Sequence, residues 1–252
     1  MIVLKSKREI EAMRELGGIL AKILGTLKTN AKPGITTKRL DEIAETECGK
    51  FGVNASSYGY HGFPGHLCIS LNQTVIHGIP GDTKIKNGDM VSFDLVIDRD
   101  GLFVDSAVTF AVGKPTALQA KLMEVTHEAL LLGIDKAVPG NRIGDISSIV
   151  QSFVEKNGFS VIRDFVGHGV GSAMHEEPQI PNFGRSGTGV LIKPGMTLAI
   201  EPMVAAGDWH IDVSDDGWTA DTRDGSLSCH FEHTIAVTED GKPIILTSET
   251  NN

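Results

Sequence analysis

Apolar residues recur at helical spacing in two segments of the chain, and these segments match each other at an offset of 106 residues. The matching pairs are Leu16 with Leu122, Ile19 with Val125, Leu24 with Leu130, Leu40 with Ile146 and Ile43 with Ile149. A Pro-Gly pair interrupts each segment, at residues 33–34 and 139–140, where a helix would end. The pattern therefore predicts the same order in each half: a helix, a Pro-Gly connection, a second helix and then a strand.

The match continues into the following strands at an offset of 107 residues. Ile85-Lys86-Asn87-Gly88 corresponds to Ile192-Lys193-Pro194-Gly195. Six residues after each of the two final glycines, an acid stands in an apolar run, Asp94 in the first half and Glu201 in the second. These two acids are therefore expected to be equivalent.

The repeat predicts a single α+β domain over residues 1–252 with two pseudo-symmetric halves, roughly 8–112 and 114–248. Their strands would form one sheet system, helices would cover its outer face, and the equivalent acids would meet near the pseudo-symmetry axis. A chance match among common Lys-Gly turns is the alternative that the sequence leaves open.

Asp94 and Asp105 stand on either side of Asp98-Arg99-Asp100-Gly101, between apolar flanks that predict a β-hairpin. With Arg99-Asp100 as the loop, the two acids would lie directly opposite each other. With Asp100-Gly101 as the loop, which turn chemistry favours, they would be diagonal neighbours. Either register puts both on one face of the sheet unless a bulge intervenes. Like charges among apolar neighbours need a cation or a shared proton, and the alternative is a solvent-facing acidic pair.

The second half repeats this arrangement with Glu201 and Glu232. Glu201 precedes Pro202 in a strand-like run and Glu232 lies in a second such run, so we expect the two acids on neighbouring strands. The connection between them is longer than the hairpin of the first half. Either glutamate alone would be interpreted as a surface acid on an edge strand.

Three histidines stand in segments bounded by Gly or Pro, namely His77, His168 and His175. The glycines around His168 in Gly167-His168-Gly169-Val170-Gly171 let backbone approach closely and leave the ring unobstructed. A single histidine beside glycine is more often a turn or core residue, but three of them together indicate a site. His61 corresponds to His168 at the offset of 107, and we do not expect it to be a ligand.

Four carboxylates, those of Asp94, Asp105, Glu201 and Glu232, and the imidazole of His168 form a hard, oxygen-rich donor set. Such a set suits manganese, iron(II), cobalt or zinc in a shared site better than structural zinc, which prefers thiolates. It fits a two-metal hydrolase, in which ions about 3.5–4 Å apart activate a water near neutral pH.

Composition argues against several other functions. The formal net charge is -9 and no dense Lys/Arg run occurs, so nucleic-acid binding is not indicated. The densest basic stretch, Lys5–Arg8, is interpreted as a solvated helix start. Met1–Lys5 lacks the long apolar region of a signal peptide, and no apolar run approaches the roughly 18 residues of a membrane span. The cysteines are few and far apart, at positions 48, 68 and 229, and we expect a cytoplasmic protein.

With these residues in view, the chain resembles the type I methionine aminopeptidases in their short bacterial form. The resemblance covers essentially the whole chain. Its motifs are His77-Gly78-Ile79-Pro80, Asp94 with Asp105, Gly167-His168-Gly169-Val170-Gly171, His175-Glu176-Glu177-Pro178, Glu201-Pro202-Met203 and Phe231-Glu232-His233-Thr234. It implies the pita-bread fold, in which two pseudo-symmetric α/β halves share a curved antiparallel sheet covered by helices.

The resemblance also implies two divalent metal ions per chain, either cobalt, manganese, iron(II) or zinc. Asp94 would bind one ion, His168 and Glu201 would bind the other, and Asp105 and Glu232 would bridge the pair. His168 has no metal-binding counterpart in the first half, so the two ions would be held unequally.

The catalytic roles implied by the resemblance fall to Glu201, His175 and His77. Glu201 would relay a proton to the leaving amine. His175 would hydrogen-bond the carbonyl oxygen as charge develops on it, and His77 would hold the peptide nitrogen side. The substrates would be the N-termini of peptides and nascent proteins, so the protein would act near the ribosome. We expect a monomer that binds no membrane.

A methionine pocket is implied at Tyr60, Phe63, Met174 and Trp218, with Ser57 at its rim. Aromatic and thioether walls suit an unbranched methionine side chain. Phe63, Met174 and Ser57 depart from the residues of some relatives, which would affect how tightly methionine is held. Ordinary core packing is the alternative for all of them.

Two rival functions remain open at this level. The first is another peptidase of the same fold, specific for proline, although the chain lacks the extra N-terminal domain of such enzymes and carries Trp218. The second is a non-catalytic binding protein of the same fold, although such relatives lose metal ligands and none is lost here.

Overall fold

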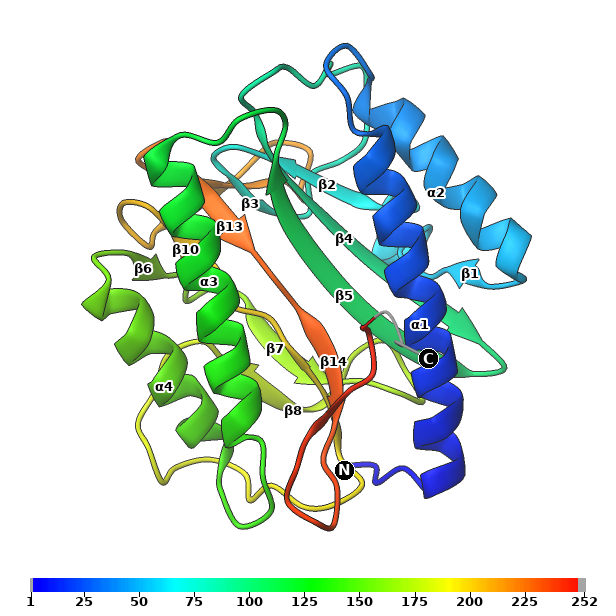
Figure 1. The fold of residues 1–252 in the computed structure, drawn as a ribbon, viewed down its shortest axis with the longest axis vertical. Helices are drawn as coiled ribbons and strands as arrows, with labels where there is room; N and C mark the ends of the chain where they lie inside the picture. Colours follow the sequence, from blue (N-terminus) through cyan, green and yellow to red (C-terminus); the bar gives the residue numbers. More distant parts are fainter. Residues whose placement is uncertain (1, 249–252) are drawn as a thin grey trace.

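The structure is a computed structural model that describes residues 2–248. Figure 1 shows two pairs of long helices beside a set of antiparallel strands. The helices are α1 (Lys7–Asn30), α2 (Thr37–Phe51), α3 (Ala117–Lys136) and α4 (Ile143–Lys156), with a short 3-10 helix, η1 (Tyr60–Gly62). The strands before α3 are β1 (Asn54–Ala55), β2 (Cys68–Leu71), β3 (Thr74–Ile76), β4 (Met90–Arg99) and β5 (Leu102–Ala111). Those after α4 are β6 (Ser160–Val161), β7 (Val166–Gly169), β8 (Glu176–Pro181), β9 (Thr197–Ile200), β10 (Met203–Ala205), β11 (Ile211–Val213), β12 (Ala220–Thr222), β13 (Ser228–His230), β14 (His233–Ala236) and β15 (Ile244–Ile245).

The first helix of each half begins with the same cap. Ser6 and Glu9 form a capping box at the start of α1, and Thr116 and Gln119 form one at the start of α3. In each box the hydroxyl accepts from a backbone N–H and the longer side chain returns the bond, so two otherwise free donors of the helix end are satisfied.

Lys5, just before the first cap, is only 5% exposed, so its interpretation as part of a solvated helix start was wrong. Lys7 and Arg8 are exposed, as that interpretation requires. The local pattern could not reveal the burial of Lys5 because its ion-pair partner, Glu176, is distant in the sequence.

The matched segments of the two halves make matched backbone hydrogen bonds. In the first half Gly34 N donates to Ile85 O (2.8 Å), and in the second Gly140 N donates to Ile192 O (3.3 Å). An isolated β-bridge joins Thr36 to Lys84, and its counterpart joins Arg142 to Leu191. The two predicted halves therefore fold alike around their Pro-Gly connections, while the outer bounds of the repeat stay a prediction.

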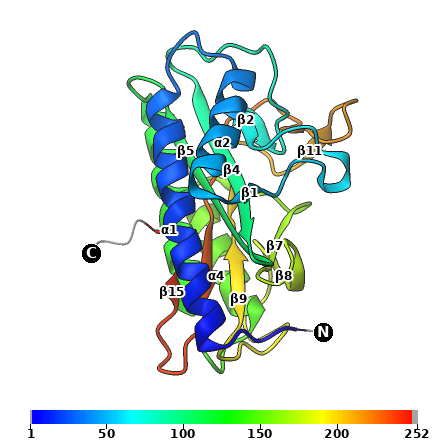
Figure 2. The ribbon, with the colours of Figure 1, turned by 90° about the vertical axis from the view of Figure 1, so that its right-hand side faces the viewer.

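The central strands come from both halves and form the layer that carries the acids. The hairpin β4–β5 pairs with β1 and β2, and a five-stranded sheet has the order β15-β14-β9-β7-β8. Figure 2 shows α1 on one side of the strands, with β7, β8 and β11 toward the other. The hydrophobic cores fill the space between helices and strands, one under α1 and α2 and others under α3 and α4. This is the expected α+β architecture with a helix-covered antiparallel sheet.

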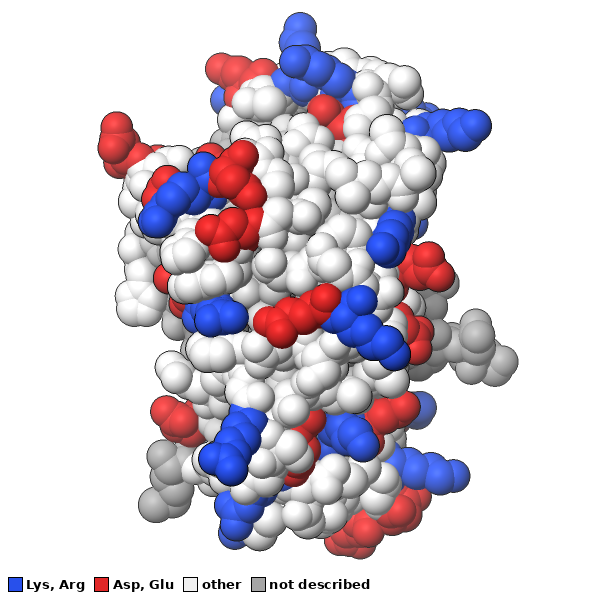
Figure 3. All heavy atoms as spheres, turned by 90° about the vertical axis from the view of Figure 1, so that its left-hand side faces the viewer, with Lys and Arg blue, Asp and Glu red and all other residues white. Residues whose placement is uncertain are grey.

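Charged side chains of both signs are interspersed on the face that α3 and α4 cover, as Figure 3 shows. That face presents no continuous basic area of the kind that follows a phosphate backbone. Of the helices within residues 2–248, none has both the length and the apolar character needed to cross a membrane.

Candidate metal centre

The β4–β5 hairpin brings Asp94 and Asp105 to one face of the sheet. Asp94 pairs with Ala107 and Asp105 pairs with Val96, so the two acids are diagonal neighbours. The loop is Asp100-Gly101, whose φ angles of 54° and 77° both lie in the left-handed region. A two-residue hairpin turn with positive φ at both central positions has a backbone twist that matches the twist of the flanking strands. The register favoured by turn chemistry is confirmed.

Glu201 and Glu232 lie in breaks between strands, so the prediction that they stand on the strands themselves was wrong. β9 ends at Ile200 and β13 ends at His230. Pro202 follows Glu201 and has no N–H to donate, which interrupts the ladder at this point. The pairs Ile200–His233 and Met203–His230 flank the break in the same register, so the two glutamates face each other across it.

Hydrogen bonds across the seam between the halves bring Asp105 beside Glu232. Asp105 N donates to Thr234 Oγ1 (2.9 Å), and Thr234 Oγ1 donates to Asp105 O (2.8 Å). Glu232 N donates to Ala107 O (3.0 Å), which satisfies the N–H that the broken ladder leaves free. Ser106 Oγ donates to Glu232 O (2.8 Å). The backbones of both acids are thus fixed by partners from the opposite half.

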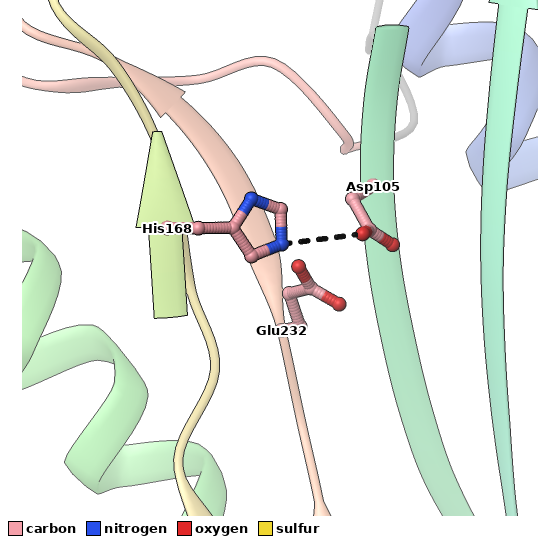
Figure 4. Close-up of side chains that lie close together, drawn as sticks. All are labelled: Asp105, His168 and Glu232. Carbon is pink, nitrogen blue, oxygen red and sulfur yellow. Dashed lines mark ion pairs between the residues drawn. The ribbon is translucent and has the colours of Figure 1, made fainter. Parts of the chain in front are cut away.

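Asp105, His168 and Glu232 converge, each offering one ligand atom within 4.8 Å of the others (Figure 4). His168 Nε2 lies 3.7 Å from Asp105 Oδ2 and 3.6 Å from Glu201 Oε1. His168 Nδ1 lies 2.8 Å from Gly169 O. A carbonyl oxygen can only accept, so Nδ1 carries the hydrogen and the neutral ring turns the Nε2 lone pair toward the carboxylates.

The buried carboxylates of this cluster would be stabilised in their charged form by a bound cation. Burial, with the nearby charge of Asp105, raises the pKa of Asp94, Glu201 and Glu232 well above the ordinary carboxyl range. Within residues 2–248, Asp105 Oδ1 and Glu232 Oε1 are buried without a hydrogen-bond partner. Buried polar atoms are normally satisfied, so these two oxygens are suited to bind a cation. The carboxylate and imidazole donors fit divalent ions of the manganese-to-zinc series.

A cavity of about 200 Å³ opens over these acids. Its lining includes every residue that the sequence put in the metal, catalytic and pocket sets, namely Ser57, Tyr60, Phe63, His77, Asp94, Asp105, His168, Met174, His175, Glu201, Trp218 and Glu232. His61 is not part of this lining, and its ring packs edge-on against Tyr60 with 4.4 Å between centroids. The structure thus brings the proposed residues around one space and leaves His61 beside it.

Aromatic rings form one wall of the cavity. The ring centroids of Phe63 and Trp218 are 5.2 Å apart, and those of Trp218 and His77 are 5.9 Å apart. Phe165, which the sequence did not single out, lies 5.4 Å from the His77 ring. Burial lowers the pKa of His77, so its ring is neutral at pH 7. The wall is therefore apolar with one uncharged imidazole.

His175 also lines the cavity. Its Nδ1 lies 2.7 Å from the Tyr60 hydroxyl, and its ring centroid lies 4.3 Å from that of His168. Desolvation, with the nearby His168, lowers the pKa of His175 to about 4. His175 is therefore a neutral hydrogen-bonding group at physiological pH.

Sequence reasoning missed two lining residues, Cys68 and Val96, and one residue beside the cluster, His230, although a signal for them existed. Cys68 pairs with Asp94 and Val96 pairs with Asp105, so strand alternation puts both on the face of the acids. His230, two residues before Glu232, is 1% exposed, and its Nε2 lies 3.6 Å from Glu201 Oε2. The same period of two could have singled it out.

Comparisons with known proteins identify the family of the chain. The model of metallopeptidase family M24 matches residues 11–239. A methionine aminopeptidase of Clostridium perfringens is 50% identical over 247 residues, covering 98% of this chain and 99% of that protein. The crystal structure of methionine aminopeptidase from Rickettsia prowazekii superposes with a TM-score of 0.96 at 40% identity, covering 98% of this chain and 100% of that one.

A prolidase from Pyrococcus horikoshii shares the fold more distantly, with a TM-score of 0.80 and 22% identity. The match covers 98% of this chain and 64% of the prolidase. The fold is thus common to both kinds of peptidase. The sequence identity of this chain is higher to the methionine aminopeptidases than to the prolidase. The chain belongs to metallopeptidase family M24 and, within it, to the methionine aminopeptidases.

Proposed function

We propose that this protein removes the N-terminal methionine from peptides and nascent proteins. The observation that carries the proposal is the convergence of buried carboxylates and one imidazole at the floor of a cavity with an apolar, aromatic wall. Family membership supports the reaction class, since the relatives of highest identity reported above are methionine aminopeptidases. A largely apolar cavity with a few convergent polar groups is the usual form of a small-substrate site.

Two divalent ions would be held by Asp94, Asp105, His168, Glu201 and Glu232. Asp105 and Glu232 are the candidates for shared ligands because they converge with His168, one from each half. Among the described residues, neither Asp105 Oδ1 nor Glu232 Oε1 has a hydrogen-bond partner. Bound there, the ions would polarise the scissile carbonyl and lower the pKa of the attacking water. Cobalt, manganese, iron(II) and zinc all suit this donor set.

The chain's own groups would orient the substrate and move the proton. The carboxylate of Glu201 would accept a proton from the water and return it to the leaving amine nitrogen. With the Tyr60 hydroxyl donating to His175 Nδ1, the neutral ring carries its hydrogen on Nε2 and can donate to the developing oxyanion. His77, on the aromatic wall, would hold the peptide nitrogen.

The methionine side chain would lie against the apolar wall. Phe63 and Met174 are 3% and 6% exposed, so both are packed in place before substrate arrives. Their neighbours in the lining, Tyr60 and Trp218, complete a surface of rings and a thioether. Such a surface suits a long, unbranched and polarisable side chain.

The setting follows from the substrate. Nascent chains carry methionine in the cytoplasm, so we propose that the enzyme acts there, near the ribosome. We also propose that it acts as a monomer. The cysteines of the described chain, Cys48, Cys68 and Cys229, are all free and buried, which suits a reducing compartment.

Competition between two peptide classes tests the proposal. The metal-loaded protein is given a Met-Gly peptide and an X-Pro peptide, and the released amino acid is measured. We expect methionine release at a much higher kcat/KM. Faster cleavage of X-Pro would favour the proline-specific rival, and a protein that binds no divalent ion at micromolar supply would favour the non-catalytic one.

A further inference from the structure

We infer that Lys5 is a positioning residue of the active site. From the N-terminal segment, it holds the turn that carries Met174 and His175 through an ion pair with Glu176. The inference deepens the proposed aminopeptidase function and rests on it.

Lys5 and Glu176 form a buried ion pair across the fold. Their side chains are 1% and 8% exposed, although 171 positions separate them in the sequence. Lysine is almost never buried without a partner, and removing one member of a buried pair leaves an uncompensated charge. The pair is therefore a specific tie between the N-terminal segment and the start of β8.

Backbone hydrogen bonds and two glycines hold the segment that carries Lys5 in place. Lys5 N donates to Gly195 O (2.7 Å), and Lys5 Nζ also lies 3.4 Å from Val3 O. A Cβ on Gly171 would stand 2.2 Å from Lys5 Cε, and one on Gly195 would stand 3.1 Å from Lys5 O. Two glycines thus leave the room that Lys5 occupies. In Figure 2 the segment ahead of α1 extends toward the side where β7 and β8 lie.

The other carboxylate oxygen of Glu176 closes the turn. Glu176 Oε1 accepts from Ser172 N (2.5 Å) and Ala173 N (3.1 Å). Gly171 O accepts from Phe103 N (2.8 Å) at the tip of the first-half hairpin. The turn is therefore anchored at its start by β5 and at its end by a carboxylate whose position Lys5 fixes.

Between these anchors lie two residues of the active-site cavity. Met174 lines it, and His175 brings its ring close to His168 and the Tyr60 hydroxyl. Both act at the substrate through side chains whose backbone lies in the turn. A small displacement of such a group lowers the rate steeply, since catalysis depends on near-ångström placement.

The experiment compares Lys5→Met, the double variant Lys5→Met/Glu176→Gln, and Lys7→Met as a matched control. Lys7 is 89% exposed in its side chain and pairs with Glu239 only at the surface (3.6 Å). For each protein we would measure kcat and KM for methionine release, the melting temperature, and amide hydrogen exchange of residues 170–177 in the metal-free state.

For Lys5→Met we expect kcat to fall by about ten- to a hundredfold, with faster exchange confined to the turn. The double variant should regain melting temperature because no charge is left buried alone, yet keep the low kcat and the fast exchange. It also keeps the test decisive if the single variant does not fold. Lys7→Met should match the wild type in every readout.

Two results would overturn the inference. One is a Lys5→Met protein with wild-type kcat and wild-type exchange of the turn. The other is a double variant that returns to wild type in both, because Lys5 would then only neutralise Glu176. Failure of the proposed function looks different: the wild type itself would release no methionine, while the exchange measurement would still report on the tie.

Discussion

Glu201 and Glu232 face each other where the β9–β14 ladder stops and the β10–β13 ladder begins. Ile200 pairs with His233 on one side of this break and Met203 pairs with His230 on the other. The two acids are therefore in register but outside the ladder. Their side chains line the same cavity as those of Asp94 and Asp105, and hydrogen bonds between β5 and the segment at residues 232–234 hold the two halves together there.

Replacing a central acid should abolish activity without unfolding the protein. Glu232→Gln and Asp105→Asn keep size and shape but remove the charge that a divalent ion needs. Since outer partners of metal ligands are worth about 10–100-fold, we expect kcat/KM to fall by more than about a hundredfold. Circular dichroism and metal analysis accompany the assay. Wild-type turnover by either variant would contradict the assignment of that residue as a shared ligand.

The seam between the halves should depend on the hydroxyl of Thr234. Thr234 is 0% exposed and both donates to and accepts from the backbone of Asp105. Thr234→Val leaves those two groups unsatisfied and should lower the free energy of unfolding by about 2–4 kcal/mol. Urea unfolding measures the loss, with Thr234→Ser as the control that keeps the hydroxyl. Equal losses for serine and valine would refute a role for the hydroxyl.

The preference for methionine should loosen when the apolar wall is cut back. Phe63 is 3% exposed and packs on Trp218, so Phe63→Ala leaves space beside the bound side chain. We expect KM for Met-initiated peptides to rise about tenfold or more, with a smaller change for Phe-initiated ones. Phe51, 39% exposed at the end of α2, offers the matched control Phe51→Ala. If the ratio of kcat/KM for Met-initiated to Phe-initiated peptides stayed the same in Phe63→Ala, Phe63 would not be part of the methionine pocket.

The stability contributed by Asp145 should depend on pH. Hydrogen bonds from Ser186 Oγ and from the backbone N–H groups of Arg142 and Gly187 hold its pKa below the ordinary 3.8. A lowered folded-state pKa stabilises the fold above the unfolded value, and this stability is lost as pH falls through the folded value.

Asp145→Asn should therefore be less stable by about 0.5–1 kcal/mol at pH 7, and the difference should shrink below about pH 4. Urea midpoints at several pH values measure it, with the exposed Asp135→Asn as control. A difference that stays constant from pH 7 to pH 3 would show that the charge of Asp145 is not involved.

The sequence predicted what local chemistry and periodicity decide. The hairpin register followed from Asp100-Gly101, because both residues accept a positive φ. Every proposed site residue lines one cavity because the repeat and the resemblance both depend on spacing that the fold keeps. Their individual roles stay predictions.

What the sequence missed depends on contacts between distant segments. Glu201 was predicted within a strand, but Pro202 cannot donate and the ladder opens there. Lys5 was predicted in solvent, and only the fold brings Glu176 to it. Phe165 reaches the cavity from a loop, where no period could mark it.

The central claim is metal-dependent release of methionine, and one measurement tests it most directly. The protein is stripped with a chelator, incubated with a short Met-Gly peptide with and without added manganese, cobalt, iron(II) or zinc, and free methionine is quantified. We predict no release from the stripped protein and restored release with at least one ion, with one methionine per shortened peptide and no further trimming. Release that survives full metal removal, or no release with any of the four ions, would contradict the account.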